Sequence, residues 1–180
     1  AQLPAIIMDR KTGRREFLRF LASAAAVCAL PGCSPEFDWR ELHAEEGRFR
    51  ILMPGRWKQT SGPAPGGAML TLWTAETRGA LFGAGYADFA DGASAHLQAM
   101  IDGLGRNIQG RLNEDREDHA AGTAGRAVRI EGMAPDGSAR QIQGRFYMRG
   151  QRLYQLVVIS QPKAVPDLEL ETFFGSFKPY

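Results

Sequence analysis

The chain has 180 residues and a formal net charge of +2, and five of its 22 basic residues but only two of its 20 acidic residues lie in positions 1–33. The remaining part therefore holds 17 basic against 18 acidic residues, a net charge of −1. Such a part lacks the basic excess with which proteins bind nucleic acid phosphates, so we expect no nucleic-acid partner. About 135 residues from Glu46 onward suffice for one domain with a sizeable core.

The first segment in chain order is a basic stretch followed by an apolar one. Its basic side chains are those of Arg10, Lys11, Arg14, Arg15 and Arg19. The apolar run over residues 17–30 measures about 21 Å as a helix, which is shorter than the roughly 30 Å hydrocarbon core of a membrane. We therefore predict a signal peptide over residues 1–33 and not a transmembrane anchor. Met8 is the natural first residue of such a leader, so we expect residues 1–7 to be upstream material.

Two arginines precede the apolar run. Arg14 and Arg15 lie directly before the segment Glu-Phe-Leu that begins the run. This arrangement resembles the twin-arginine export signal, which a receptor recognises. Gly13 stands where that signal usually has Ser or Thr, and Arg19 stands where it usually has Lys. General secretion of the unfolded chain therefore remains the alternative.

The apolar run ends in the tetrapeptide Leu-Pro-Gly-Cys at residues 30–33. This tetrapeptide resembles the bacterial lipobox, whose Cys is acylated and becomes the first residue of the mature chain. Pro31 replaces the small residue usual at its position, and an ordinary leader that happens to end in Cys is the alternative. Acyl chains on Cys33 would hold the protein on a membrane, since each buried methylene contributes about 0.8 kcal/mol. We therefore expect a lipoprotein anchored in the bacterial envelope and facing the periplasm.

Two neighbouring residues refine this expectation. Ser34 after the acylated Cys favours the outer membrane over the inner one, under the sorting rule of enteric bacteria. Cys28 would leave with the leader, so the exported domain would contain neither a disulfide nor a free thiol. Its stability would then depend on the hydrophobic core alone.

The following residues predict a tether and the first elements of a domain that covers residues 47–180. Residues 34–46 mix Pro, acidic residues and Trp39 without a period, so we predict a tether. Residues 47–53 alternate between apolar and polar side chains, which predicts a half-buried strand. Residues 59–67 contain two Pro and three Gly and predict a mobile loop. Two strands joined by a short turn follow, over residues 68–76 and 80–89.

The best helix pattern begins at Ser94, whose side chain can cap the first turn. Its apolar residues recur at the spacing of a single buried stripe, made of Leu97, Met100, Ile101, Leu104 and Ile108. Gly103 and Gly105 each cost up to about 1 kcal/mol in a helix, so packing on a sheet has to offset this loss. The predicted end of the helix is Gly110.

A hairpin, a strand and a short helix complete the domain. The hairpin covers residues 126–148, with strong turn chemistry at residues 135–138. The strand at residues 153–160 is apolar on both faces, so we expect it in the middle of a sheet that is covered on both sides. The short helix opens at Pro166, and its buried stripe is made of Leu170, Phe173, Phe174 and Phe177.

Together these elements predict an α+β domain in which an antiparallel sheet is sandwiched between helices, because strands joined by tight turns run antiparallel. Three segments, at residues 49–57, 150–159 and 173–178, resemble the PsbP-like family. The resemblance implies an α/β/α sandwich around an antiparallel sheet and accessory or assembly roles at membrane complexes. It implies no shared catalytic motif.

Two short motifs raise the question of catalysis or nucleotide binding. The stretch Gly-Ala-Ser-Ala-His around Ser94 follows a strand and opens a helix, which is the context of a nucleophile elbow. His96 stands where that motif needs its second Gly, so we interpret Ser94 as a helix cap. Gly83 and Gly85 begin a dinucleotide-binding pattern that lacks its third Gly. We interpret both glycines as sites of close backbone packing beneath Trp73 or the long helix.

Acidic residues cluster after the long helix, together with a histidine. Their oxygen atoms suit hard divalent cations, which makes Asp115, Asp118 and His119 the candidate metal ligands. Their spacing matches no ligand pattern, and a solvated acidic loop is the alternative interpretation. We expect no cofactor.

Three functions are compatible with these features. The first is a non-catalytic envelope lipoprotein, an accessory or assembly subunit that binds a membrane protein complex. The second is a periplasmic module that binds a small ligand or a divalent metal in a pocket under the loop at residues 59–67. The third is an uncharacterised enzyme, which twin-arginine export favours because that route carries folded, often cofactor-loaded proteins. We expect the first function, without enzymatic activity.

Overall fold

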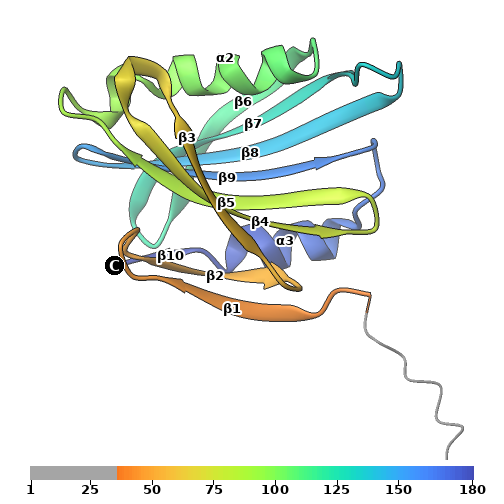
Figure 1. Ribbon diagram of the computed structural model, residues 1–180, viewed down its shortest axis with the longest axis horizontal. Helices are drawn as coiled ribbons and strands as arrows, with labels where there is room; N and C mark the ends of the chain where they lie inside the picture. Colours follow the sequence, from red (N-terminus) through yellow and green to blue (C-terminus); the bar gives the residue numbers. More distant parts are fainter. Residues whose placement is uncertain (1–35) are drawn as a thin grey trace, which may run out of the picture. The chain divides into compact units, whose positions relative to one another are not determined.

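The computed structural model describes residues 36–180, which form two antiparallel sheets and two α-helices (Figure 1). The predicted signal peptide, with Arg14 and Arg15, and the predicted acylation site Cys33 lie outside these residues. In the described part, no helix has the length and apolar character needed to cross a membrane.

Seven strands form the large sheet, in the order β3-β4-β5-β9-β8-β7-β6, and β1, β2 and β10 form the small sheet. All neighbouring strands are antiparallel. The strands are β1 (Trp39–Ala44), β2 (Phe49–Pro54), β3 (Lys58–Pro63), β4 (Met69–Thr77), β5 (Ala80–Asp88), β6 (Arg111–Ala120), β7 (Thr123–Met133), β8 (Ala139–Arg149), β9 (Arg152–Ser160) and β10 (Lys178–Pro179). The helices are α2 (Leu97–Asn107) and α3 (Asp167–Gly175), with short 3-10 turns η1 (Pro65–Gly67) and η2 (Ala93–Ala95).

Strand β9 is the fourth of the seven strands in the large sheet and is buried along almost its whole length. Leu153 and Val157 pack beneath α2, whereas Tyr154 and Leu156 pack on the opposite face. The side chains alternate in this way because successive residues of a strand point to opposite faces. The prediction that this strand lies in the middle of a sheet covered on both sides is confirmed.

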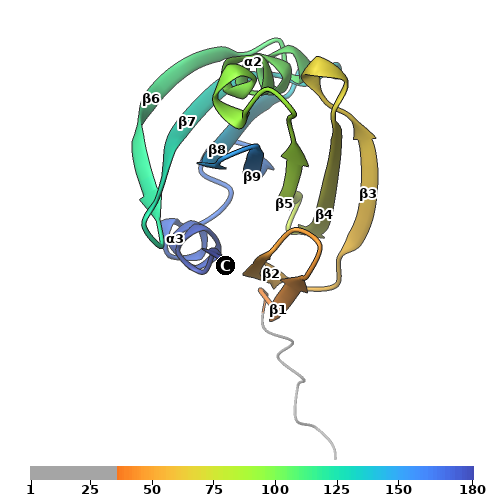
Figure 2. The same cartoon turned by 90° about the vertical axis from the view of Figure 1, so that its left-hand side faces the viewer.

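Different layers cover the two faces of the large sheet (Figure 2). Helix α2 covers one face with its buried residues Leu97, Met100, Ile101 and Leu104. Helix α3 and the small sheet cover the other face, where Phe173 and Phe49 are fully buried. The predicted sandwich is therefore confirmed in part, because the large sheet is antiparallel and has a helix on each face. Strands supply much of the second layer, which the prediction assigned to helices.

The tether predicted over residues 34–46 is shorter than expected, because most of this segment belongs to the domain. Strand β1 pairs with β2 along its whole length. Leu42 points into the core, and Trp39 Nε1 donates a hydrogen bond to Glu169 Oε2 at 3.0 Å. Even Phe37, ahead of the strand, is buried. The polar residues that alternate with the buried ones face outward. Because polar residues dominate the composition of the segment, the composition did not indicate a strand.

The large sheet ends in two strands that the sequence pattern did not predict. β3 lies in the expected mobile loop, and β6 lies in a stretch interpreted only as polar. None of their side chains is buried. These strands are instead held in the sheet by backbone pairing, β3 with β4 and β6 with β7. A bulge between Leu112 and Glu114 interrupts β6. β3 ends in Pro63, a residue that an edge strand tolerates.

Helix α2 begins at Leu97, three residues after the predicted start. Ser94 lies exposed in η2, and no side chain caps α2 by a hydrogen bond. The predicted cap at Ser94 is therefore wrong, because the 3-10 turn at residues 93–95 delays the start of the helix. The buried stripe of this helix is confirmed.

The glycines of β5 pack closely, as predicted, but against strands. A Cβ atom on Gly85 would lie 2.2 Å from the carbonyl oxygen of Thr71 in β4. A Cβ atom on Gly83 would lie 3.0 Å from Val157 Cγ2 in β9. The nearest atoms thus belong to the neighbouring strands and not to Trp73 or the long helix.

Candidate functional site

The three candidate metal ligands all lie on the edge strand β6. Alternation along the strand places Asp115 and His119 on one face of the sheet and Asp118 on the other. Arg126 donates to both carboxylate oxygens of Asp115, with 2.6 Å between Nε and Oδ1. The hydroxyl of Tyr147 donates to Asp118 Oδ2 at 2.8 Å. The structure therefore does not bring the three together, and across residues 36–180 no three His, Cys, Asp or Glu side chains are grouped to hold a metal ion.

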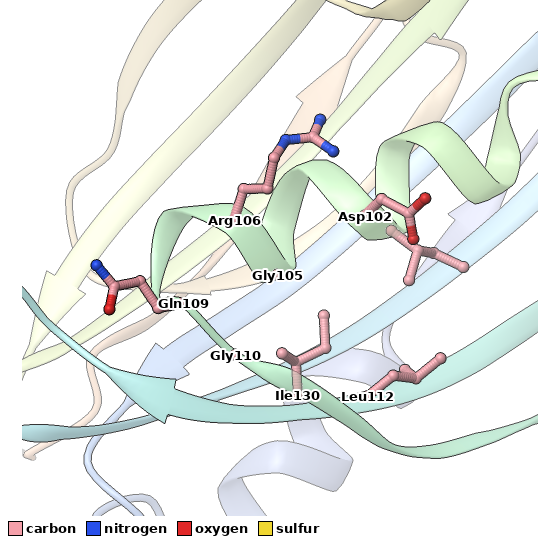
Figure 3. Close-up of a pocket in the computed structure, with 8 residues that line it drawn as sticks. Asp102, Gly105, Arg106, Gln109, Gly110, Leu112 and Ile130 are labelled. Atoms are coloured by element: carbon pink, nitrogen blue, oxygen red, sulfur yellow. The ribbon is translucent and has the colours of Figure 1, made fainter.

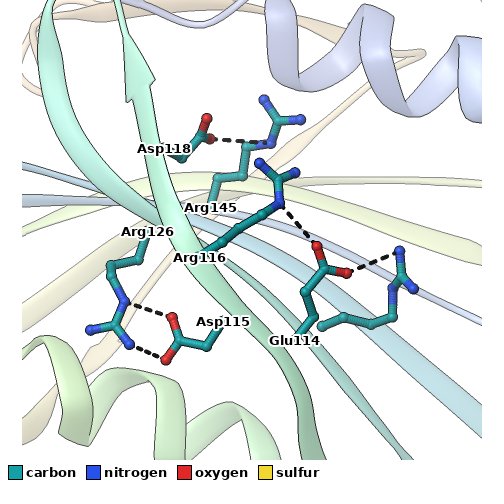
Figure 4. Close-up of polar contacts among 7 residues, drawn as sticks. Glu114, Asp115, Arg116, Asp118, Arg126 and Arg145 are labelled. Atoms are coloured by element: carbon teal, nitrogen blue, oxygen red, sulfur yellow. Dashed lines mark hydrogen bonds and ion pairs between the residues drawn. The ribbon is translucent and has the colours of Figure 1, made fainter.

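The acidic residues of β6 belong to a ladder of ion pairs that continues onto β7 and β8 (Figure 4). Glu114 Oε1 accepts a hydrogen bond from Arg116 Nε at 2.9 Å, and its other oxygen lies 3.3 Å from Arg129. Arg145 Nε lies 3.5 Å from Asp118 Oδ2. The partners of Glu114 lie on β6 itself and on the neighbouring β7, whereas Arg145, the partner of Asp118, lies on β8, one strand further in. The ladder therefore supports strand pairing through interactions within the molecule.

Tyr147 is the buried end of this ladder. Its ring is fully buried and stacks on Phe177, with 5.2 Å between the ring centroids. Burial and the hydrogen bond to Asp118 raise the pKa of Tyr147 above its usual value of 10.0. The phenol therefore stays protonated at neutral pH and acts as a hydrogen-bond donor to the carboxylate.

His96, in the stretch considered as a nucleophile elbow, is held by its neighbours. Its ring stacks on Phe89 with a centroid distance of 4.2 Å, and its Nε2 lies 2.7 Å from Asp91 Oδ1. The hydrogen bond with His96 lowers the pKa of Asp91. Ser94 is exposed, and among the side-chain hydrogen bonds of residues 36–180 none involves its hydroxyl. The structure thus shows a histidine paired with an aspartate but no serine bonded to it.

A hollow of about 380 Å³ opens beside His96, close to the position predicted for a ligand pocket. The turn η1 forms one wall, and a Cβ atom on Gly66 would lie only 2.3 Å from His96 Cε1. The turn therefore rests directly on the imidazole ring. Phe89 and Asp88 form part of the opposite wall.

A second hollow, of about 340 Å³, lies between α2 and the strands β6 and β7 (Figure 3). Ile130 points from β7 toward the helix, and Leu112 beside it remains exposed. Asp102, Arg106 and Gln109 form the polar rim. The floor is apolar and the charged groups lie only at the edge, so this hollow offers little to orient a polar ligand.

A third hollow, of about 520 Å³, opens at the end of the sheet where the turn between β1 and β2 meets the turn between β8 and β9. We name it the arginine hollow, and its lining residues are Glu45, Glu46, Arg48, Arg149, Arg152, Tyr154 and Tyr180. These residues come from three distant segments of the chain. No local pattern could therefore reveal the hollow, although the arginines on both sides of the turn at Gly150 were a visible sign of positive charge.

Arg152 is the fixed centre of the arginine hollow. Its Nε and one terminal nitrogen donate to the two carboxylate oxygens of Asp88, at 2.7 and 2.6 Å. Its other terminal nitrogen donates to the carbonyl oxygen of Glu46 at 2.9 Å, and its guanidinium lies 4.4 Å from the ring centroid of Tyr86. The hydrogen bonds to Asp88 raise the pKa of Arg152 further. The side chain is thus ordered before any partner binds.

Arg48 and Arg149 supply the other positive charges of the arginine hollow. Arg149 stands directly opposite Arg152 across the β8–β9 hairpin, where like charges repel by up to about 1 kcal/mol. Arg48 has a φ of 52°, a left-handed conformation that costs a non-glycine residue about 1 kcal/mol. In the described part of the chain neither Arg48 nor Arg149 forms an ion pair. Both guanidinium groups are therefore available to an incoming anionic group.

Comparison with protein-family models and with curated protein sequences gives no match for this chain. The fold is similar to the solution structure of cyanobacterial PsbP (CyanoP) from Synechocystis sp. PCC 6803, with a TM-score of 0.54 and 11% identity over 86% of this chain and 99% of that one.

Two further solved structures show lower TM-scores. One is a protein of unknown function from Pseudomonas aeruginosa, with a TM-score of 0.44 and 14% identity over 73% of this chain and 89% of that one. The other is a protein from Bacteroides thetaiotaomicron, with a TM-score of 0.48 and 10% identity over 78% of this chain and 48% of that one. The similarity to CyanoP covers nearly the whole of both proteins, so the domain of this chain has a PsbP-like fold.

Proposed function

We propose that this protein is a non-catalytic accessory protein of the bacterial envelope. In this proposal, acylated Cys33 holds the exported chain on a membrane, and the arginine hollow binds a membrane protein complex. The PsbP-like fold supports the proposal, because the resemblance to that family implies accessory and assembly roles.

The observation that carries the proposal is the charge arrangement in the arginine hollow. Arg48 and Arg149 present free guanidinium groups, while Glu45 and Glu46 are exposed at the same opening. A small anion would meet both attraction and repulsion there. A protein surface with charges of both signs can satisfy both sides, and Arg and Tyr are enriched at protein–protein interfaces.

The fixed geometry of Arg152 favours binding further. Binding usually costs free energy because side chains at the interface lose their freedom. Asp88, Tyr86 and the Glu46 carbonyl already order Arg152, so this part of the cost falls on folding and not on association. Arginines packed in this way are frequent among the residues that contribute most to interfaces.

The interaction is tested by photo-crosslinking in cells that produce the full chain. A photoreactive residue replaces the exposed Gln151, next to the arginine hollow, or Asp136, in the turn at the opposite end of β8. We expect a crosslinked adduct with a membrane protein from position 151 and none from position 136. Arg48→Glu with Arg149→Glu is expected to abolish the adduct, because like charges facing each other across an interface cost several kcal/mol.

The matched control for this test is Arg106→Glu with Arg111→Glu, which makes the same change of charge at exposed positions away from the hollow. We expect this control to retain the adduct. Equal crosslinking from both positions, or an adduct that survives the reversal at Arg48 and Arg149, would contradict the proposed binding surface.

The anchor is tested separately by labelling cells with a radioactive fatty acid. We expect the label in the mature chain and its loss in Cys33→Ala. A chain that keeps residues 1–33 and carries no acyl mass would contradict the proposed membrane attachment. It would not decide whether the arginine hollow binds a partner, which only the crosslinking tests.

A second candidate function, binding of a small ligand, is favoured by the hollow beside His96. Its walls combine the stacked rings of Phe89 and His96 with the carboxylate of Asp91, whereas the carboxylate of Asp88, which also lines the hollow, is bound by Arg152. Native mass spectrometry of protein folded in the cell tests this candidate. A retained mass that is lost in His96→Ala would support it.

A further inference from the structure

We propose that the end of the large sheet opposite the arginine hollow lies against the lipid surface and binds its anionic headgroups. We name it the anchor-side end and define it by the turns at residues 55–58, 76–79, 134–140 and 161–166. The inference deepens the proposed function, because acylated Cys33 is what brings this end to the membrane.

The first argument is the length of the chain between the acylation site and the domain. Phe37 is only 8% exposed and packs edge-on against Phe82, with 6.2 Å between the ring centroids. From Cys33 to Phe37 the chain advances four residues, which reach about 14 Å at most when fully extended. The corner of the domain around Phe37 is therefore held close to the lipid.

The second argument is the length of the sheet. Strand β8 has 11 residues and spans about 36 Å, from Ala139 at the anchor-side end to Arg149 in the arginine hollow. The link of about 14 Å is less than half of this length. The two ends of the sheet are therefore not equivalent for an anchored chain, because only one of them adjoins the anchor.

The third argument is that several turns gather around the start of the domain. The hydroxyl of Thr77 donates to the carbonyl oxygen of Glu36 at 3.0 Å, and Arg78 forms an ion pair with the Glu36 carboxylate. These contacts fix the entry of the chain on the turn between β4 and β5. Strand register brings the remaining turns to the same end, since Leu81 pairs with Ile159 and Gln141 pairs with Ser160 (Figure 1).

The fourth argument is charge. The anchor-side end carries five basic side chains, those of Arg56, Lys58, Arg78, Arg140 and Lys163. Its acidic side chains are those of Glu76 and Asp136, and Glu36 adds a third beside them. Arg78 is neutralised by Glu36, whereas the other four basic residues form no ion pair within residues 36–180. Unpaired Lys and Arg near a membrane are attracted to anionic lipid headgroups.

The outer face of the small sheet also adjoins Phe37, and its one carboxylate, that of Glu41, faces Arg50 and Lys178. Glu41 Oε2 lies 2.7 Å from His43 Nε2, and Glu41 Oε1 lies 3.9 Å from Arg50. This face therefore offers less uncompensated positive charge than the anchor-side end. The comparison selects the end of the sheet, and not the outer face of the small sheet, as the surface against the lipid.

Two apolar side chains complete the anchor-side end. Trp57 is half-buried in the turn between β2 and β3, and Leu168 is 70% exposed in the first turn of α3, just beyond residues 161–166. Trp is frequent at the boundary between headgroups and acyl chains. Leu168 is flanked by Asp167 and Glu169, so it adds apolar area to this end but no positive charge.

The orientation is tested with the acylated full chain in vesicles of phosphatidylglycerol and phosphatidylethanolamine. Single cysteines at Lys163→Cys, Arg149→Cys and His43→Cys are treated with a membrane-impermeant maleimide. We expect loss of labelling at position 163 and full labelling at positions 149 and 43. Insertion of about twelve Gly and Ser residues after Ser34 lengthens the link, and in high salt, which screens the attraction to the headgroups, it is expected to restore labelling at position 163.

Equal labelling at positions 163 and 149 with the native link would overturn the proposal, as would protection of position 43 in place of position 163. Absence of fatty acid on Cys33 would contradict the proposed function instead. The two failures are therefore distinguishable.

Headgroup binding is tested without the anchor, using the mature chain with Cys33→Ala and the same vesicles. Each Lys or Arg held at an anionic surface contributes about fivefold to partitioning, so Lys58→Glu with Lys163→Glu is expected to reduce partitioning by about 25-fold or more. Arg48→Glu with Arg149→Glu makes the same change of charge at the other end and is expected to leave partitioning unchanged. An equal loss in both double variants would overturn the proposal.

Discussion

The two faces of the large sheet are packed with different chemistry. The face beneath α2 is mainly aliphatic, with Leu97, Ile101, Leu104, Ile130 and Ile142 among its buried residues. The opposite face is mainly aromatic, with Phe49, Trp73, Phe82, Tyr147, Tyr154, Phe173, Phe174 and Phe177 among its buried residues. The aromatic face also holds the buried phenols and leads to the arginine hollow. The aliphatic face thus packs against α2, whose buried stripe is visible in the local sequence. The aromatic face packs against segments that are distant in sequence, and it contains the buried tyrosines.

The largest expected effect comes from breaking the aromatic face at Phe49, which is fully buried. Its ring meets Trp73 and Tyr154 edge-on, with centroid distances of 5.7 and 5.9 Å, and meets Phe177 at 5.6 Å. Phe49→Ala is expected to lower the free energy of unfolding by about 3–5 kcal/mol, measured by urea denaturation. The small sheet is held by this contact, so its loss should be felt across the whole layer.

The matched control lies on the aliphatic face. Ile101 is also buried, and Ile101→Val removes one methylene at a cost of about 0.5–1.5 kcal/mol. A loss for Phe49→Ala no larger than that for Ile101→Val would show that the aromatic face does not hold the small sheet in place.

An intermediate effect is expected from Tyr147→Phe. This variant tests whether the aromatic face makes the free energy of unfolding depend on pH. Burial raises the pKa of Tyr147 in the folded protein, so the unfolded chain loses this proton first, at about pH 10. Above that pH the unfolded state binds fewer protons, and the wild-type free energy of unfolding must fall as pH rises. Tyr147→Phe should weaken this fall, at a cost of about 1 kcal/mol at neutral pH for the lost hydrogen bond to Asp118.

The measurement is the urea midpoint at neutral pH and above pH 10, compared between the wild type and Tyr147→Phe. Burial also raises the pKa of Tyr154, so part of the dependence should remain in the variant. An unchanged dependence in Tyr147→Phe would show that the phenol does not keep its proton in the folded state.

The smallest effect is expected at Ser94, at the edge of the aliphatic face. Because Ser94 is exposed in η2 and does not cap α2, Ser94→Ala should change the free energy of unfolding by less than about 0.5 kcal/mol. Thermal unfolding followed by circular dichroism measures this change. A loss near 1 kcal/mol would restore Ser94 as the helix cap.

The elements that were predictable from sequence are those whose burial has a local period. The stripe of α2 and the alternating faces of β9 each depend on side chains a few residues apart, so the pattern and the structure agree. Strands β1, β3 and β6 escaped prediction because polar residues dominate their outward faces and backbone pairing holds them. Their partners lie elsewhere in the chain, where no local period can indicate them.

The candidate site shows the same limit. Asp115, Asp118 and His119 are close in sequence, yet the extended strand β6 keeps them apart. Asp118 points to the opposite face from the other two, and four residues of strand, about 13 Å, separate Asp115 from His119. Arg48 and Arg152 are far apart in sequence, yet two turns bring them to one hollow. Closeness in sequence was therefore a poor guide to closeness in space for this site.

The edge strand β6 affects whether copies of this protein aggregate with one another. β6 has ten residues and pairs only with β7, so its outer edge is a template on which a second chain can add its own strand. The dense charges of β6, its bulge after Leu112, and Pro63 in β3 at the far edge all oppose such addition. In the proposed anchored protein, copies confined to a membrane would collide often, and these edge features would oppose their assembly into fibres.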